Sequence, residues 1–255
     1  MKESKTNSGL LFFLEKIIRS HPLLYFIIRY FIRYTNIFEQ DANGVSYLNF
    51  RKKVNIIDVG ASDGIASKFF NRKLNVNKII CYEPYIPYVN ILKKLKIKNL
   101  KVCAFGIDQH NKHYDVYFPR YKFFSKNFDL ITYTFYNKNQ LLKQINLDFI
   151  FKKNIYIVKE KIFLKKVQKK TKIDLIKIDV NGHEFSVIKG LKHVIKRDKP
   201  ALIVETGDDI KKIERYLKRY NFKKFTFSTI NNKFIDKNDK SSLNTFFLQS
   251  KHLNF

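Results

Sequence analysis

The chain has 255 residues, of which 45% are hydrophobic and 16% aromatic. That is enough apolar material to bury the core of one generous domain, which excludes an intrinsically disordered chain. Lysine and arginine number 50 against 22 acidic residues, a formal net charge of +28. Because the basic residues are spread through every segment, the charge favours nucleic acid, anionic lipid or acidic polymers without selecting one.

Residues 1–50 are predicted to form an amphipathic helical extension. Pro22 favours a helix start, which gives one helix before it and another after it. No apolar run in residues 10–38 reaches the roughly 18 uninterrupted residues that a spanning helix needs. Two interpretations stay open: the helices associate peripherally with an anionic membrane, or they form a cap packed on the sheet.

Residues 51–255 are predicted to form the main domain, because strand and helix patterns alternate along them after a loop at Asp41–Gly44. The first expected elements are strands at 54–58, 79–83 and 100–104, with helices near 65–74 and 88–95. Those after an insertion are a strand ending at 179, a helix at 184–196, a strand at 201–205, a helix near 209–220 and an antiparallel edge pair at 222–228 and 244–249. This alternation predicts parallel strands joined by right-handed crossovers.

The cysteines and two of the histidines give no metal signal. Cys81 and Cys103 lie inside apolar strand patterns without C-x-x-C spacing, so we interpret them as core residues in a reducing compartment, the cytoplasm. His110 and His113, three apart, could ligate a metal on a helix, but as a loop pair with no partner carboxylate they are interpreted as solvated. No metal ligands are predicted.

The run from Val54 to Ser67 ends a strand in an acid and then turns through two glycines. Gly60 and Gly64 can adopt positive φ, and Asp58 stands at the carboxyl end of the strand, where α/β sheets bind ligands. Both the dinucleotide fingerprint and the phosphate loop are absent. The loop suits a ligand with an ammonium and a carboxylate, such as the methionine half of S-adenosylmethionine; a plain turn is the alternative.

Two more acids follow strands further along the chain. Glu83 ends the second strand 25 residues after Asp58, and a carboxylate there can accept hydrogen bonds from both hydroxyls of a ribose. Pro84 stops that strand, because it cannot donate to a ladder. Asp108 follows the third strand, where related folds hold the adenine edge. The alternative for Glu83 is a solvated glutamate at a strand end, and the alternative for Asp108 is an acid in a turn.

An insertion is predicted at about residues 110–170, where periodicity is poor. Strands are expected at 114–119 and 155–164, and the segments between them are rich in aromatic residues, lysine and asparagine. Such an insertion can form a wall over an acceptor pocket. Its aromatic faces favour stacking on sugar rings over a nucleobase platform, although the composition resembles both.

Taken together, these segments resemble the FkbM-type family of S-adenosylmethionine-dependent methyltransferases over roughly residues 54–250. That family's pattern is approximately I-D-V-G-A-N-x-G-x-x-S, then F/Y-E-P, then I-K-I-D-V-E-G-x-E with a following L-K-G, then a strand ending in glutamate. The matching positions are Asp58, Gly60, Ala61, Gly64, Ser67, Glu83, Pro84, Lys177, Asp179, Gly182, Glu184, Gly190 and Glu205. Ser62 replaces the usual asparagine, and Asn181 replaces the usual glutamate, which removes a carboxylate near the reacting centre.

The resemblance implies a Rossmann-like class I methyltransferase fold, α/β in class, with a mostly parallel seven-stranded sheet. It also implies S-adenosyl-L-methionine as the cofactor. The residues expected to bind it are Asp58, Gly60, Ala61, Ser62, Gly64, Ser67, Glu83, Pro84, Asp108 and Asp179.

The expected reaction is an in-line displacement assisted by removal of the acceptor's hydroxyl proton. Asp179 is the first candidate for contact with both cofactor and acceptor. His183 is a candidate base, with Glu184 or Glu205 orienting it or acting instead. The alternatives are a surface role for His183 and a first-turn helix acid at Glu184. The sequence leaves open whether Asp179 and Glu205 share a divalent cation.

Three function classes stay open. The first, suggested by the resemblance, is an O-methyltransferase acting on a sugar of a cell-surface polysaccharide or glycolipid. The second, motivated by the charge, is an RNA methyltransferase, with nucleic acid the less favoured partner. The third is a non-catalytic adaptor with a cofactor fold, motivated by Asn181. The sequence does not specify the acceptor or the oligomeric state.

Overall fold

The computed structural model describes residues 21–25, 27, 38–50, 52–168, 170–236 and 242–253. The chain divides into two compact units, one of residues 38–114 and 162–255 and the other of residues 1–37 and 115–161. Most of the predicted amphipathic segment 10–38 lies outside the described residues, so both interpretations of it stay predictions. Within the described ranges, no helix is long and apolar enough to cross a membrane.

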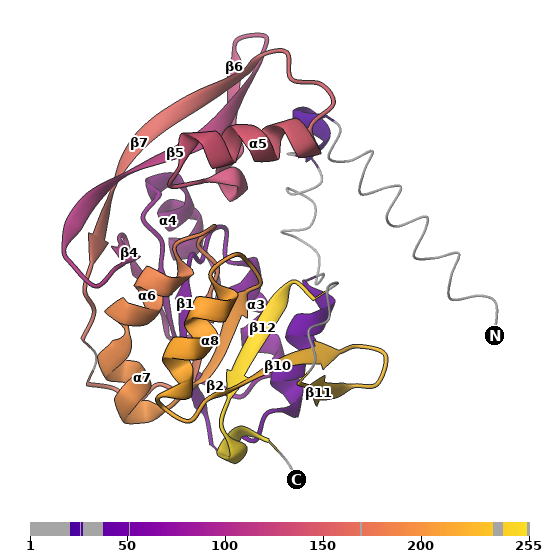
Figure 1. Cartoon of the computed structure of the whole chain (residues 1–255). Helices are drawn as coiled ribbons and strands as arrows, with labels where there is room; N and C mark the ends of the chain where they lie inside the picture. Colours follow the sequence, from indigo (N-terminus) through magenta and orange to yellow (C-terminus); the bar gives the residue numbers. More distant parts are fainter. Residues whose placement is uncertain are drawn as a thin grey trace. The chain divides into compact units, whose positions relative to one another are not determined.

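The larger unit is built on an eight-stranded sheet in the order β11-β10-β12-β9-β8-β1-β2-β3 (Figure 1). Its strands are β1 (Val54–Val59), β2 (Val76–Tyr82), β3 (Leu100–Cys103), β8 (Leu175–Ile178), β9 (Ala201–Glu205), β10 (Lys223–Ser228), β11 (Lys233–Ile235) and β12 (Asn244–Leu248). The strands from β3 to β9 in this order run parallel. The predicted Rossmann-like, mostly parallel sheet is confirmed.

The closing strands differ from the prediction in one respect. β10 and β12 pair antiparallel as expected, and β12 lies between β10 and β9. However, β11 pairs antiparallel with β10 and forms the outer edge, which gives eight strands rather than seven. β11 has three residues, too few for an alternating pattern to be recognised.

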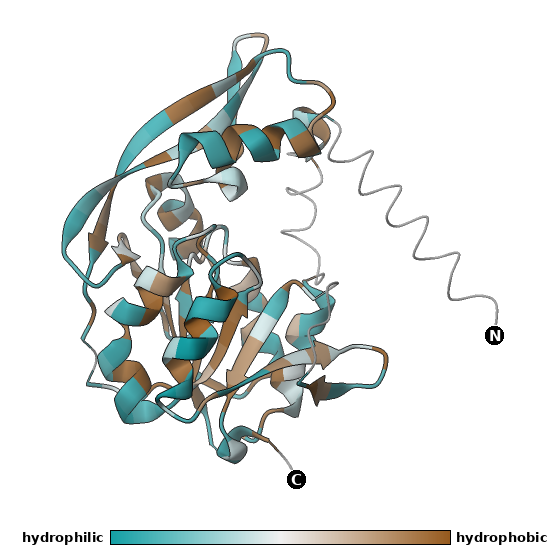
Figure 2. Ribbon diagram, in the orientation of Figure 1, coloured by the Kyte–Doolittle hydropathy of each residue, from teal (hydrophilic) through white to brown (hydrophobic). Residues whose placement is uncertain are grey.

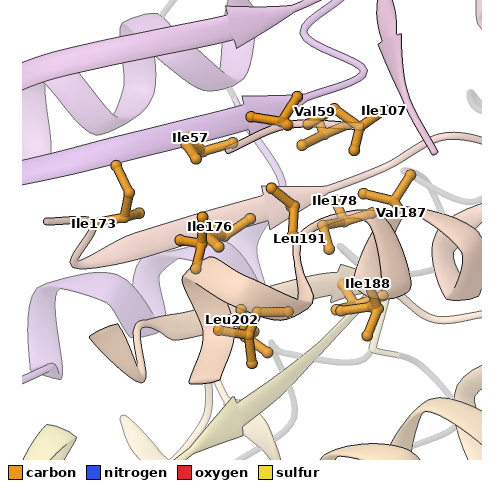
Figure 3. Packing of buried hydrophobic residues seen from close by; sticks show 14 of the residues in the cluster. Ile57, Val59, Ile107, Ile173, Ile176, Ile178, Val187, Ile188, Leu191 and Leu202 are labelled. Carbon is orange, nitrogen blue, oxygen red and sulfur yellow. The ribbon is translucent and has the colours of Figure 1, made fainter. Parts of the chain in front are cut away.

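Helices cover both faces of this sheet, because its strands are apolar on both sides. One face packs on the 3-10 helix η1 (Gln40–Tyr47), α3 (Ile65–Lys73) and α4 (Ile86–Lys93). The other packs on α6 (Glu184–Gly190), α7 (Lys192–Asp198) and α8 (Ile210–Lys218). Figure 3 shows Ile57 and Val59 of β1 with Ile176 and Ile178 of β8 against Ile188 of α6. The 3-10 helix η3 (Ser250–His252) follows β12.

The single helix predicted at 184–196 is wrong, because the chain forms α6 and α7 with Leu191 between them. Gly190, the last residue of α6, packs closely on the backbone of Asp108. A Cβ added to Gly190 would lie 2.5 Å from that carbonyl oxygen. The glycine permits this approach and weakens helix propensity at the same point.

The loop predicted at Asp41–Gly44 is also wrong, since these residues lie in η1. Asp41 is buried and accepts hydrogen bonds of 2.7–2.8 Å from the Ser242 hydroxyl and from the backbone and side-chain nitrogens of Asn244. Residues 38–50 therefore belong with the sheet, and the domain boundary predicted at residue 50 differs from the structural one.

The smaller unit holds an antiparallel hairpin and one well-formed helix. Its elements are β5 (Lys112–Phe123), β6 (Lys126–Asp129), η2 (Ile131–Tyr133), α5 (Lys138–Asp148) and β7 (Ile155–Lys165). These strands form a second sheet with β4 (Gly106–Ile107), which belongs to the larger unit, in the order β4-β7-β5-β6. The strands predicted at 114–119 and 155–164 are confirmed as β5 and β7, whose ends at 112–114 and 162–165 belong to the larger unit. Asn137 caps α5 by accepting from the backbone of Asn139 at 2.8 Å. The core of the smaller unit consists of Leu130, Tyr133, Leu141, Ile145 and Phe149.

Candidate active site

The first glycine loop follows β1 and is shaped by its neighbours. Gly60, Ser62 and Gly64 have φ of +76°, +50° and +81°, a region that glycine adopts most readily. A Cβ on Gly60 would lie 1.8 Å from the carbonyl oxygen of Asp179. The loop after β1 therefore touches the end of β8, which brings two of the sequence motifs into direct contact.

Asp58 lies beneath this loop and is completely buried. Its Oδ2 accepts a 2.6 Å hydrogen bond from the Ser67 hydroxyl, and Ser67 also lies 3.2 Å from the sulfur of Cys81. Burial raises the pKa of Asp58, and the Lys177 ammonium opposes that shift. Asp58 Oδ1 and the buried hydroxyl of Ser62 have no hydrogen-bond partner in the described part of the chain.

Glu83 connects the loops that follow β1 and β2. Its carboxylate accepts hydrogen bonds from the backbone N–H groups of Ser62, at 2.8 Å, and Tyr85, at 2.9 Å. Burial raises its pKa to about 7, although both N–H groups lower it. Ala61 is buried and Pro84 partly exposed. Each carboxylate oxygen has two lone pairs, so Glu83 keeps acceptor capacity for a ligand hydroxyl.

Lys177 lies in β8, side by side with Asp58 of β1 in the parallel register. Its Nζ donates to Oδ2 of Asp179 at 2.7 Å, and its side chain is 3% exposed. Burial alone would lower the pKa of Lys177, but the carboxylates of Asp179, Asp58 and Glu39 outweigh burial and raise it. The lysine is therefore a fixed positive charge among acidic side chains.

Glu39 and Asn244 complete this network from distant parts of the chain. Oε2 of Glu39 accepts a 2.8 Å hydrogen bond from the side-chain amide of Asn244. Burial raises the pKa of Glu39, and the charge of Lys177 lowers it. The sequence analysis missed both residues and noted Lys177 only as a motif match. A lysine interrupting the apolar strand L-I-K-I was a usable signal, whereas nothing marked Glu39.

Asp179 and Glu205 come together at the carboxyl ends of the neighbouring parallel strands β8 and β9. Their carboxyl groups are hydrogen bonded to one another. Burial raises the pKa of Glu205 to about 9, and the negative charge of Asp179 adds to the shift. Near neutral pH the pair therefore holds one proton, while the Asp179 side chain, 32% exposed, remains accessible.

Glu184 holds the turn that follows Asp179. Its Oε1 accepts hydrogen bonds from the backbone N–H groups of Gly182, at 2.9 Å, and Val180, at 3.3 Å. Asn181 and Gly182 have φ of +51° and +94°. Asparagine tolerates the left-handed region better than glutamate, so the backbone explains why an asparagine is accommodated at this position.

His183 is directed to Asp108. Its Nε2 lies 2.7 Å from Oδ2 of Asp108, which also lies 3.2 Å from Nζ of Lys112. Oδ1 of Asp108 accepts from the backbone of His110 at 3.0 Å. Burial lowers the pKa of His183, although the charge of Asp108 opposes this shift. Burial alone would raise the pKa of Asp108, but these hydrogen bonds outweigh burial and lower it. The structure thus groups His183 with Asp108, and Asp179 with Glu205.

A metal site is not formed by the side chains that the structure describes. No group of three or more histidine, cysteine, aspartate or glutamate residues among them is arranged to hold a metal ion. The Asp179–Glu205 pair is instead neutralised by its shared proton and by Lys177.

The mostly parallel sheet with acids at its strand ends defines an α/β protein with a candidate ligand site at the carboxyl ends of its strands. Residues 58–224 match the profile of the methyltransferase FkbM domain. Because this match covers more than half of the chain, the protein belongs to the FkbM methyltransferase family. No match was found among curated protein sequences.

Solved structures of methyltransferases are similar to this chain at low identity. The FkbM methyltransferase of Methylobacillus flagellatus KT is 14% identical, with a TM-score of 0.48 over 80% of this chain and 47% of its own. TrmK of M. capricolum, bound to S-adenosyl-homocysteine, is 9% identical, with a TM-score of 0.41 over 86% and 72%. Precorrin-6y C5,15-methyltransferase of Geobacter metallireducens GS-15 is 11% identical, with a TM-score of 0.40 over 81% and 84%. The chain spans about half the length of the Methylobacillus protein.

Proposed function

We propose that the protein transfers a methyl group from S-adenosyl-L-methionine to a hydroxyl of a sugar in a cell-surface polysaccharide or glycolipid. The observation that carries this proposal is the convergence of Asp58, Glu83, Asp179 and Glu205 at the carboxyl ends of four parallel strands. Ligands of open α/β sheets bind at that edge. The sugar acceptor is supported by the family resemblance.

The residues present fit the cofactor. The unpartnered hydroxyl of Ser62 offers a polar group to its aminoacyl end, in a loop whose turn depends on the positive φ of Gly60 and Gly64. Glu83 offers carboxylate oxygens to the ribose hydroxyls. Asp58 acts from beneath by holding Ser67. When bound, the cofactor supplies an electrophilic methyl group on a sulfonium.

The Asp179–Glu205 pair is the proposed base. A sugar hydroxyl is a weak nucleophile until its proton is accepted, and a carboxyl pair with one shared proton has room for a second. The Asp179 side chain is 32% exposed, and Lys177 fixes its orientation through the 2.7 Å hydrogen bond. His183 and Glu184 serve to hold the surrounding loops, through Asp108 and through the turn at Gly182.

Binding of S-adenosylhomocysteine is expected to strengthen as the pH rises through about 7. Burial raises the pKa of Glu83 to about 7, and the ionised carboxylate is the better acceptor for ribose hydroxyls. Calorimetry one unit above and one unit below that pKa measures the difference. Glu83→Gln should bind roughly tenfold more weakly at the higher pH and lose the pH dependence. A pH dependence unchanged in Glu83→Gln would contradict this role.

The acceptor class is tested with radiolabelled S-adenosylmethionine and separate pools of polysaccharide, glycolipid and RNA. We expect alkali-stable label in the polysaccharide or glycolipid fraction, as a methyl ether of a sugar. Label in RNA alone would refute the sugar acceptor and favour the RNA methyltransferase suggested by the charge of +28. Asp179→Asn is the negative control for enzyme-dependent labelling.

A further inference from the structure

The smaller unit carries exposed apolar side chains at two turns. Phe123 and Phe124 occupy the turn between β5 and β6, and Phe124 is 85% exposed. Leu147, Ile150 and Phe151 lie at the end of α5 and in its connection to β7, and Leu147 is 71% exposed. Figure 2 shows hydrophobic, brown residues in the connection that follows α5. Large apolar side chains gathered on a surface indicate an interaction site.

Ring contacts join the two turns into one surface. Tyr121 stacks on Phe123 with ring centroids 6.3 Å apart. The ring of His21 lies 5.4 Å from Tyr121 and 5.7 Å from Phe151. Phe123 in turn contacts Phe124 at 4.6 Å. The aromatic side chains therefore form a continuous path from one turn to the other.

The same turns are strongly basic. The backbone N–H of Lys122 donates to the carbonyl of Asn154 at 3.0 Å, which holds the turns together. Residues 121–128 and 149–156 include no aspartate or glutamate, whereas Asp148, between Leu147 and Ile150, is acidic and accepts a 2.8 Å hydrogen bond from the Gln144 amide. The basic residues are all exposed lysines: Lys122, Lys126, Lys152 and Lys153. We refer to these lysines with Phe123, Phe124, Leu147, Ile150 and Phe151 as the turn surface.

We propose that the turn surface docks the protein on an anionic lipid bilayer. Its apolar side chains would enter the boundary between headgroups and acyl chains, while its ammonium groups contact the lipid phosphates. Apolar area and attraction to anionic lipid both contribute to interfacial binding. Leu147 and Ile150 are aliphatic and cannot stack on bases, which favours lipid over single-stranded nucleic acid. This docking is independent of the methyl acceptor.

Co-sedimentation of the full chain with lipid vesicles tests the proposal. We expect binding to vesicles of phosphatidylserine mixed with phosphatidylcholine and much weaker binding to phosphatidylcholine alone. Each turn-surface lysine changed to glutamine should weaken binding about fivefold. Phe124→Ser combined with Ile150→Ser should weaken it at least about tenfold, because one large apolar side chain is lost from each turn.

Matched controls separate local from overall effects. The charge control changes four exposed lysines of the larger unit to glutamine, namely Lys93, Lys94, Lys96 and Lys98. It lowers the net charge as much as changing all four turn-surface lysines does. Ile230→Ser removes a 90% exposed isoleucine from that unit. Retained binding in these controls supports the turn surface. The proposal is overturned by equal losses in the controls, by no binding of the unaltered chain, or by turn-surface variants that lose single-stranded RNA binding but keep vesicle binding. Melting temperatures verify that every variant is folded.

Discussion

Replacing Asp179 with asparagine is expected to lower the rate of methyl transfer by about 10²–10⁴-fold, the usual contribution of a positioned base. Within the carboxyl pair, the Asp179 side chain is 32% exposed and accepts a 2.7 Å hydrogen bond from Lys177. Asparagine has the same shape, and its carbonyl oxygen can still accept from Lys177 Nζ. The variant should therefore keep the fold and lose only the ability to accept a proton.

Three measurements on Asp179→Asn distinguish this role from a structural one. Calorimetry should give S-adenosylhomocysteine affinity within a few-fold of the unaltered protein, and thermal melting should show a folded chain. Single-turnover kinetics should show a slow chemical step. Glu214→Gln, which removes a 42% exposed carboxylate that pairs with Lys224, is the control that keeps full activity. Turnover near the normal rate in folded Asp179→Asn would remove Asp179 from the mechanism.

The edge of the sheet that carries the candidate site could be predicted from sequence. Asp58, Glu83, Asp179 and Glu205 each follow a short apolar run, and parallel strands place their carboxyl ends at one edge. The turn after the first of these strands could also be predicted, because glycine permits the positive φ found at Gly60. Local pattern and position in the sheet were sufficient to find these acids.

The partners of these acids could not be predicted, since they are set by tertiary packing. Glu39 precedes a 3-10 helix whose pattern is weak, and it approaches Lys177 only because Asn244 and Asp41 hold that helix against β12. His183 was a candidate base from its neighbours in sequence, but Asp108, 75 residues away in the chain, holds its ring. Sequence spacing carries no information about such contacts.

Asn181 illustrates how backbone conformation changes the meaning of a substitution. From sequence alone, a missing glutamate suggested a chain without catalysis. In the structure, Asn181 has φ of +51° and adjoins Gly182 at +94°, a turn that asparagine adopts at lower cost than glutamate. The carboxylates that the proposed mechanism uses, Asp179 and Glu205, are both retained. The turn therefore accounts for the asparagine itself, and the adaptor interpretation stays a hypothesis that the labelling experiment tests.

Replacing Lys177 with methionine is expected to destabilise the fold by about 3–5 kcal/mol, the cost of removing one partner of a buried ion pair. Methionine fills a similar volume but leaves Asp58, Asp179 and Glu39 without their cation. Chemical denaturation measures the change. Lys224→Met, which breaks the more exposed pair with Glu214, is the matched control and should cost about 1 kcal/mol or less.

The pH dependence of that loss identifies its electrostatic cause. Lys177 lowers the pKa of Asp58, Glu39 and Glu205 in the native protein, so removing it raises all three further above their unfolded values. A carboxyl whose pKa is raised on folding stabilises the native state at low pH, and that stability is lost as the pH rises through the raised pKa. The loss of stability in Lys177→Met should therefore be smaller in acid than at neutral pH.

Lys177→Met with Asp58→Asn should recover part of the deficit in unfolding free energy at neutral pH, because one uncompensated carboxylate is gone. A deficit equal at both pH values, with no recovery in the double variant, would mean that Lys177 acts through packing and not through its charge.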